Sequence, residues 1–227
     1  MTRARLIAGL AACVVFSAAL AFAAGSASFA PDRGKFKIMV NGAQAGEETF
    51  SIAPDGGNWV AHGVTHVQTS AGSTRVTGNL TLHPDGTPVK YEWSTQGVQK
   101  ASAEITFSGP VARIDLHVEG KRPYTQQFTF SSSKIAVLDN NLYDQFAVLA
   151  RLYDWQAGGE QTFPVLIPQA LTPGSITLNS LDQQDSGGQK LTELQVKTAD
   201  LEVDLFLDGQ KLVRIVSPAA NAEILRE

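Results

Sequence analysis

Polar and apolar residues alternate along most of this chain. The clearest runs are Lys35 to Val40, Thr74 to Leu82 and Val89 to Ser94. A period of two places successive side chains on opposite faces of a β-strand. Turn sequences separate the runs, among them Asn41-Gly42, which suits a type I′ turn, and the stretch from His83 to Pro88. The sequence predicts a mainly β protein, an antiparallel meander that forms a barrel or a strongly curved sheet.

The pattern changes over residues 141–154, where the apolar positions follow the spacing of an amphipathic helix. These positions are Leu142, Phe146, Leu149, Ala150 and Tyr153. Asp139 or Asn140 is the expected N-cap, and Asp144 lies near the helix start, where the helix dipole favours a negative charge. We expect one helix, about 141–154, packed on the sheet, and further strands from Gln161 to Val216.

The first residues have the pattern of an export signal. Arg3 and Arg5 precede an apolar run from Leu6 to Ala23, which ends in the A-x-A cleavage pattern Ala21-Phe22-Ala23. A transmembrane anchor is the alternative for a run of this length. We expect residues 1–23 to be a signal peptide and 24–227 a single β-rich domain, periplasmic or secreted, without a membrane span after cleavage.

Cys13 suggests a different localisation for the protein. Leu10-Ala11-Ala12-Cys13 spells a bacterial lipobox, which would attach a lipid at Cys13, but the apolar run continues past the cysteine where a lipoprotein turns polar. We therefore favour cleavage after Ala23. Because Cys13 is the only cysteine, the mature domain would contain no thiol and no disulfide.

Composition narrows the function. The chain has 227 residues, a formal net charge of −4 and a sequence pI of about 5.6. Its lysines and arginines are scattered, so no basic footprint for nucleic acid is present. No stretch is typical of an interdomain linker, and the most polar segment, Asp182 to Gln189, is interpreted as a hairpin loop. No cofactor motif is evident.

Three segments resemble the DUF3108-like family of exported bacterial proteins of unknown function. They are Gly78 to Pro88, the helical stretch Asn141 to Tyr153 with the following Gly158 to Val165, and Val203 to Gly209 with Leu212 to Ile215. The resemblance implies an all-β, barrel-like fold with a helix. It implies no activity and no functional residues.

The candidate chemical sites have simpler explanations. His62 and His66 lie four residues apart in a strand pattern, about 13 Å, which is too far to share a metal ion. His83 and His117 have no obvious partner, and no G-x-S-x-G motif is present, so a hydrolase is the less favoured function.

Two groups of acidic residues also suggest sites. Asp139-Asn140-Asn141 with Asp144 is rich in the oxygen ligands that calcium prefers, but a helix cap explains the same residues and is favoured. Glu92, Glu104 and Asp115 could form a carboxylate pair across strands, as in a glycosidase, yet outward strand positions commonly carry charge. We predict no catalytic and no metal-ligating residues.

Aromatic residues gather around the predicted helix. They either pack the helix on the sheet or line an apolar cavity that the helix closes, as in carriers built on barrels. The predicted ligand-binding set is Phe128, Phe130, Tyr143, Phe146, Leu149, Tyr153, Trp155 and Phe163. We expect a non-enzymatic exported module that binds an apolar or amphipathic molecule. The alternative is an envelope structural module that binds another envelope protein.

Overall fold

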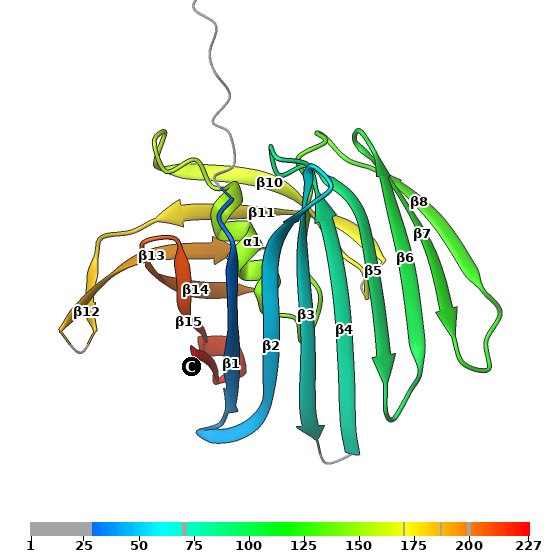
Figure 1. The fold of residues 1–227 in the computed structure, drawn as a ribbon, viewed down its shortest axis with the longest axis horizontal. Coiled ribbons are helices and arrows are strands. Elements are labelled where there is room, and N and C mark those ends of the chain that lie inside the picture. Colours follow the sequence, from blue (N-terminus) through cyan, green and yellow to red (C-terminus); the bar gives the residue numbers. More distant parts are fainter. Residues whose placement is uncertain (1–28, 70–71, 170, 187, 199–200) are drawn as a thin grey trace, which may run out of the picture.

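The computed structural model describes residues 29–69, 72–169, 171–186, 188–198 and 201–227 (Figure 1). This part of the chain is mainly β, with one α-helix. The predicted signal peptide and Cys13 lie outside the described residues. The strands before the helix are β1 (Asp32–Val40), β2 (Ala43–Asp55), β3 (Asn58–Thr69), β4 (Gly72–Leu82), β5 (Pro88–Gln96), β6 (Ala101–Ser108), β7 (Val111–Val118), β8 (Tyr124–Thr129) and β9 (Ala136–Val137).

The second half begins with the helix. Its elements are α1 (Asp144–Leu152), β10 (Glu160–Ile167), β11 (Thr172–Ser180), β12 (Gln184–Ser186), β13 (Gln189–Lys197), β14 (Glu202–Asp208), β15 (Lys211–Ser217), the 3₁₀ turn η1 (Pro218–Ala220) and β16 (Ala222–Arg226). The segment that was predicted to be only a hairpin loop, Asp182 to Gln189, contains the short strand β12, which pairs with β13.

The described strands form one sheet in the order β8-β7-β6-β5-β4-β3-β2-β1-β16-β15-β14-β13-β11-β10-β9. The predicted antiparallel meander is present as β1–β8, and β1 continues it into the second half by pairing with β16. One prediction needs correction, because the pair β9–β10 is parallel and not antiparallel. The order ends in β8 on one side and β9 on the other, which agrees with the curved-sheet alternative and not with a closed barrel.

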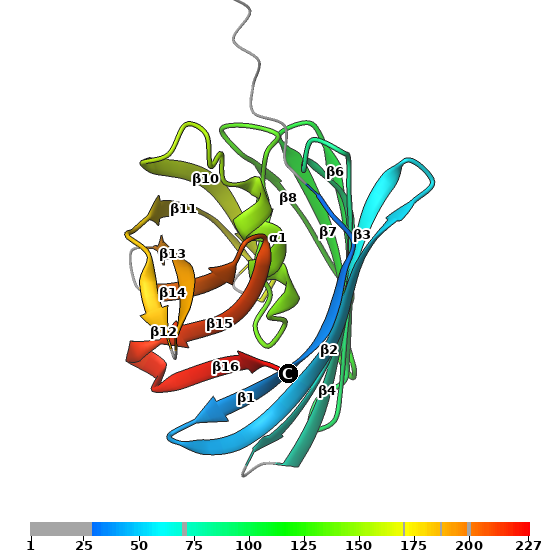
Figure 2. The same cartoon turned by 60° about the vertical axis from the view of Figure 1, so that its left-hand side comes forward.

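Figures 1 and 2 show how the sheet curves. The strands β1–β8 form one wall, β10–β15 form the facing wall, and α1 lies between the two. Alternate residues of each strand therefore point to a concave inner face or to an outer face. Phe36, Ile52, Leu80, Tyr91 and Ile105 point inward and are buried, and they belong to the same core as the apolar side chains of α1 and of the facing wall.

The turn between β1 and β2 follows from its two residues. Asn41 has φ 51° and Gly42 has φ 76°, the positive values that a type I′ turn needs and that Asn and Gly tolerate best. The predicted Asn-Gly hairpin is thus confirmed, with β2 starting directly after it.

The helix is shorter than predicted and begins differently. It spans Asp144–Leu152 instead of 141–154, and its N-cap is Tyr143, which forms no side-chain cap hydrogen bond. The prediction that Asp139 or Asn140 caps it is wrong. The first amides are satisfied from the sheet instead, because Glu48 of β2 accepts hydrogen bonds from the backbone N–H groups of Tyr143 (2.7 Å) and Asp144 (2.8 Å).

Two glycines make room for the start of the helix. Gly63 of β3 and Gly78 of β4 are direct cross-strand partners on the inner face. A Cβ atom at Gly63 would lie 2.7 Å from Oδ1 of Asp144, and one at Gly78 would lie 2.5 Å from Cδ1 of Leu142. The pair, which we call the glycine notch, lets the segment around Leu142 and Asp144 reach the sheet backbone.

A buried ion cluster joins β1, β16 and the last turn of the helix. Asp32 lies 3.0 Å from Arg151 of α1 and 2.6 Å from Arg226 of β16. Burial alone would raise the pKa of Asp32, but the hydrogen bonds from Arg226 and Arg151 hold it below its ordinary value. Arg226 also donates to the carbonyl of Arg33, so the cluster fastens both walls and α1 at one point.

The glycine notch can be tested by substitution. Gly78→Val would place side-chain atoms where Leu142 packs, and we expect the free energy of unfolding to fall by about 1–3 kcal/mol, as for other overpacked cores. Thr77→Val, one residue earlier and on the outer face, is the control and should change it by less than about 0.5 kcal/mol. Urea unfolding followed by circular dichroism measures both; equal effects would contradict the notch.

The ion cluster gives a second prediction. Arg151→Met removes one of the two cations from buried Asp32, and we expect the free energy of unfolding to fall by about 3 kcal/mol. Arg113→Met breaks an exposed pair with Asp115 and should cost at most about 1 kcal/mol. Urea denaturation of the two variants makes the comparison, and an Arg151→Met protein as stable as Arg113→Met would show that the cluster is dispensable.

Candidate functional site

The residues of the predicted ligand-binding set fall into a buried group and a group nearer the surface. Phe128, Phe130, Leu149, Tyr153 and Phe163 are buried in the core. These residues belong to the same core as α1, which agrees with the interpretation that the set packs the helix on the sheet. The grooves described on the surface are lined by other residues, and a role of this set as a cavity wall stays a prediction.

The remaining three members of the set lie nearer the surface. Tyr143 and Phe146 are half-buried and pack against the core. Trp155 is 42% exposed, stacks edge-on against Tyr153 and donates from Nε1 to the carbonyl of Ala150 at 3.0 Å. Trp155 therefore closes the C-terminal end of the helix.

The inner face carries an apolar strip that the helix does not cover. From Gly78 of the notch, direct cross-strand neighbours run through Trp93 of β5, Ala103 of β6, Leu116 of β7 and Tyr124 of β8. We call these last four residues the apolar strip. Exposure varies along the strip: Trp93 and Leu116 are half-buried, Ala103 between them is buried, and Tyr124 at the far end is 44% exposed.

The next row of the inner face extends this surface. Ala101 and Val118 are cross-strand partners, and both are half-buried. The strip thus forms one side of a wider apolar area at the ends of β5–β8, on the same face as α1. A face of this kind suits apolar or amphipathic molecules, since their burial is driven by the apolar area removed from water.

Carboxyl groups surround the start of α1, beside the strip. Glu48 is fully buried and, besides the two helix amides, accepts a hydrogen bond from Oγ1 of Thr65 at 2.8 Å. Burial raises the pKa of Glu48 to about 7, although these three donors oppose the rise. Glu48 replaces the side-chain cap that the helix lacks.

Asp139 is the second buried carboxyl. Its Oδ2 accepts from the hydroxyl of Tyr91 at 2.7 Å, its Oδ1 accepts from Gln169 at 2.5 Å, and its backbone N–H donates to Gln145 of α1. Burial raises the pKa of Asp139 to about 7. The residue that was predicted to cap the helix, or to bind calcium, thus holds the segment before the helix against β5.

Asp144 is the third buried carboxyl. It is in the first turn of α1, as predicted, but it is buried against the glycine notch, and its Oδ1 forms no hydrogen bond with the described residues. Burial, with the nearby charges of Glu48 and Asp139, raises the pKa of Asp144 well above its ordinary value. An unpaired buried carboxylate is costly, so this environment favours the protonated form of Asp144.

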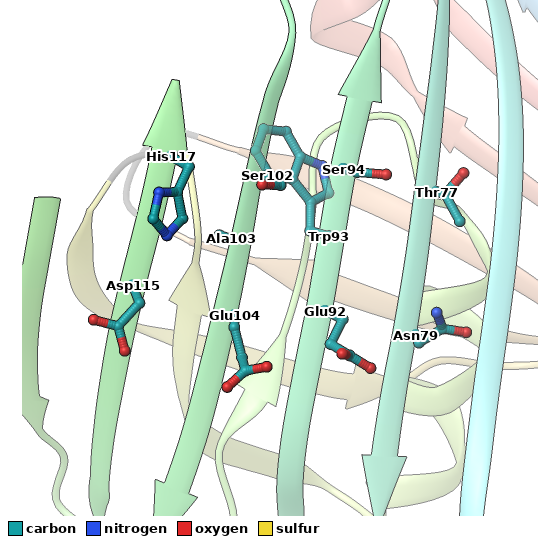
Figure 3. Close-up of a pocket in the computed structure, with 10 residues that line it drawn as sticks. All are labelled: Thr77, Asn79, Glu92, Trp93, Ser94, Ser102, Ala103, Glu104, Asp115 and His117. Atoms are coloured by element: carbon teal, nitrogen blue, oxygen red, sulfur yellow. The ribbon is translucent and has the colours of Figure 1, made fainter. Parts of the chain in front are cut away.

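The outer face has a separate polar groove of about 550 Å³ across β4–β7. Figure 3 shows Asn79, Glu92, Glu104 and Asp115 in one row across the four strands. The cross-strand register puts a second row beside it, consisting of Thr77, Ser94, Ser102 and His117. The three carboxylates that the sequence suggested are therefore brought together.

The charges in this groove are neutralised. Lys90 lies 2.9 Å from Glu92 and 2.8 Å from Glu104. Hydrogen bonds from Arg113 and Thr125 hold the pKa of Asp115 below its ordinary value. The general acid of a glycosidase needs a raised pKa, so Asp115 is unsuited to that role.

The histidines do not assemble a metal site. Nδ1 of His62 lies 2.7 Å from Oδ1 of Asn79, and His66 is exposed on the same strand. His117 faces Ser102 across the outer groove, with no hydrogen bond described between them. Among the described residues, no group of three or more His, Cys, Asp or Glu is placed to hold a metal ion.

Comparison of the chain with protein-family models, with curated proteins and with solved structures gives no match. The resemblance to DUF3108-like proteins, and the export that it implies, stay predictions. In the described part of the chain, α1 is too short to cross a membrane.

Several residues of the site were missed from the sequence, although a signal was present. Glu48 stands in phase with Phe50 and Ile52, and Asp32 stands in phase with Phe36. The alternation therefore already placed both carboxyls on the buried face. What it could not supply was the partner, because Glu48 and the amides it binds are separated by about 95 residues.

The hydrogen bond to Asp139 can be tested with Tyr91→Phe. The substitution removes a buried donor, so we expect the free energy of unfolding to fall by about 1–3 kcal/mol and the pKa of Asp139 to rise further, because that donor favours the charged form. Urea unfolding and NMR titration of the Asp139 carboxyl carbon measure the two effects. Tyr124→Phe, which removes an exposed hydroxyl, is the control; an unchanged Asp139 titration in Tyr91→Phe would refute the assignment.

Proposed function

We propose that this protein is an exported, non-enzymatic binding module, periplasmic or secreted, that holds an apolar or amphipathic molecule on its inner face. The observation that carries the proposal is the apolar strip. Its residues come from four adjacent strands, share the face that supports α1, and pass from half-buried Trp93 to exposed Tyr124.

The surroundings of the strip favour an amphipathic ligand. Its helix-side end leads to the glycine notch and to the buried carboxyls of Glu48 and Asp144, while its other end opens at β8. An apolar chain laid along the strip would contact Leu116 and Ala103, and its polar end would stay in water beside Tyr124. Apolar surface of this kind is the usual lining of small-molecule sites.

The alternative is a protein-binding module of the envelope, and the edge strand β8 supports it. Among the described residues β8 pairs only with β7, and its sequence, Tyr124 to Thr129, contains no charged residue. Natural sheets commonly protect such edges with charges, and an unprotected edge can receive a partner strand. In this case the ligand would be an extended peptide and would not need the strip.

The strip is tested by a pair of neighbouring substitutions. Leu116→Lys introduces a charge on the inner face, and His117→Lys, the next residue, introduces the same charge on the outer face. We expect Leu116→Lys to weaken the binding of a dansyl-labelled fatty acid by about tenfold or more, since losing one buried leucine contact is worth about 1.5–3 kcal/mol. His117→Lys should bind as the parent protein does.

Fluorescence titration gives the dissociation constants, and circular dichroism confirms that both variants fold. A parent protein that does not bind the fatty acid, or two variants that bind equally well, would refute a ligand on the strip.

A further inference from the structure

Three carboxyl groups meet where α1 docks on the sheet, and none of them has a cation beside it among the described residues. Glu48 binds the first amides of the helix, Asp139 binds Tyr91 and Gln169, and Asp144 is enclosed over the glycine notch. Each side chain is at least nine-tenths buried. Helix capping explains Glu48, and the hydrogen bonds to Tyr91 and Gln169 explain Asp139, but Oδ1 of Asp144 is buried with no partner among the described residues.

The titratable groups around the cluster can be named element by element. β2 contributes Glu48, β5 contributes Tyr91, and the segment entering α1 contributes Asp139, Tyr143 and Asp144. The strands β3 and β4 contribute Thr65 and the two notch glycines, which do not titrate.

The nearest cation on the helix serves another partner. Arg151 lies about two turns further along α1, where it is bound to Asp32. The electrostatic influences on Asp144 come from Glu48 and Asp139, so within the described residues the charges of this cluster are balanced only by protons.

The helix start packs closely at the notch. Asp144 and Leu142 lie against Gly63 and Gly78 at distances that exclude a Cβ atom. A negative charge on Asp144 would therefore be buried beside Glu48 and Asp139, with its Oδ1 unpaired among the described residues. The next residue along the row from Gly78 is Trp93, where the apolar strip begins.

We propose that α1 is a proton-linked gate: while the carboxyls of Glu48, Asp139 and Asp144 share protons, the start of α1 stays docked in the glycine notch, and loss of those protons releases it and uncovers the inner face next to the strip. The role of the gate rests on the proposed function, since the gate would admit or release the ligand that binds on the strip. The movement of the helix does not depend on any ligand.

The direction of the pH effect follows from the raised pKa values. Glu48 and Asp139 have pKa values of about 7 in the folded protein, above the ordinary values of 4.5 and 3.8. The docked state therefore binds more protons than the released state between about pH 4 and pH 7. Docking is most stable below this window and weakens as the pH rises through it.

Hydrogen exchange of the full chain, read by mass spectrometry, tests the gate without a ligand. After correction for the intrinsic pH dependence of exchange, we expect amides of residues 143–152 to exchange at least tenfold faster at pH 8 than at pH 5.5. Amides of β14 and β15 should keep their protection, which excludes global unfolding. Equal protection of α1 at both pH values, or loss of protection throughout the sheet, would overturn the proposal.

Two variants connect the effect to the cluster. Asp144→Asn and Asp139→Asn keep the shape of the side chains but cannot ionise, and each should reduce the pH effect on α1 by at least threefold. Glu104→Gln, on the outer face, is the matched control and should leave it unchanged. An undiminished pH effect in both Asn variants would refute the role of these carboxyls.

A ligand measurement separates this proposal from the function it serves. The dansyl-labelled fatty acid should associate with the parent protein faster at pH 8 than at pH 5.5, and with Asp144→Asn at similar rates. If the fatty acid fails to bind at any pH while α1 still opens, the ligand assignment fails and the gate stands. If it binds but exchange in α1 is independent of pH, the gate fails and the binding function stands.

Discussion

The docking of α1 on β2 organises the inside of this protein. Glu48 accepts two backbone N–H groups from a helix start that has no side-chain cap of its own, so the helix is completed by the sheet. A nine-residue helix is marginal in isolation. Its position between the two walls in Figure 2 therefore depends on tertiary contacts, with the carboxyl cluster at its first turn and the Asp32–Arg151 pair at its last.

The carboxyls at the two ends of the helix have pKa values shifted in opposite directions. At the first turn, burial raises the pKa values of carboxyls that lack a cation. At the last turn, Asp32 is also buried, but two guanidinium groups keep its pKa low. Burial alone thus does not decide the charge of a carboxyl; the presence of a cation does. In the proposed gate, the anchor at Asp32 would hold at neutral and alkaline pH, while the docking of the first turn weakens because its buried carboxyls become charged.

Much of the fold could be predicted from the alternation of residues. The meander of β1–β8, the Asn41-Gly42 turn and the presence of a single helix in the described residues all follow from local patterns. The pairing of β1 with β16 and the parallel pair β9–β10 could not, because they depend on contacts far apart in sequence. The site could not be predicted for the same reason. In the local sequence Glu48 is one more strand residue, and only the position of α1 shows which amides it binds.

The pairing of β1 with β16 has a consequence for how the sheet is assembled. β1 is the first described strand and β16 the last, and the register joins Phe36 to Arg226. The two walls become one sheet only when both strands are present, and Arg226 then completes the ion cluster around Asp32. During synthesis, the edge of β1 that pairs with β16 would stay unpaired until β16 has been made. The β1–β16 pairing therefore joins residues that are very far apart in sequence, and contacts of this kind make β proteins fold slowly.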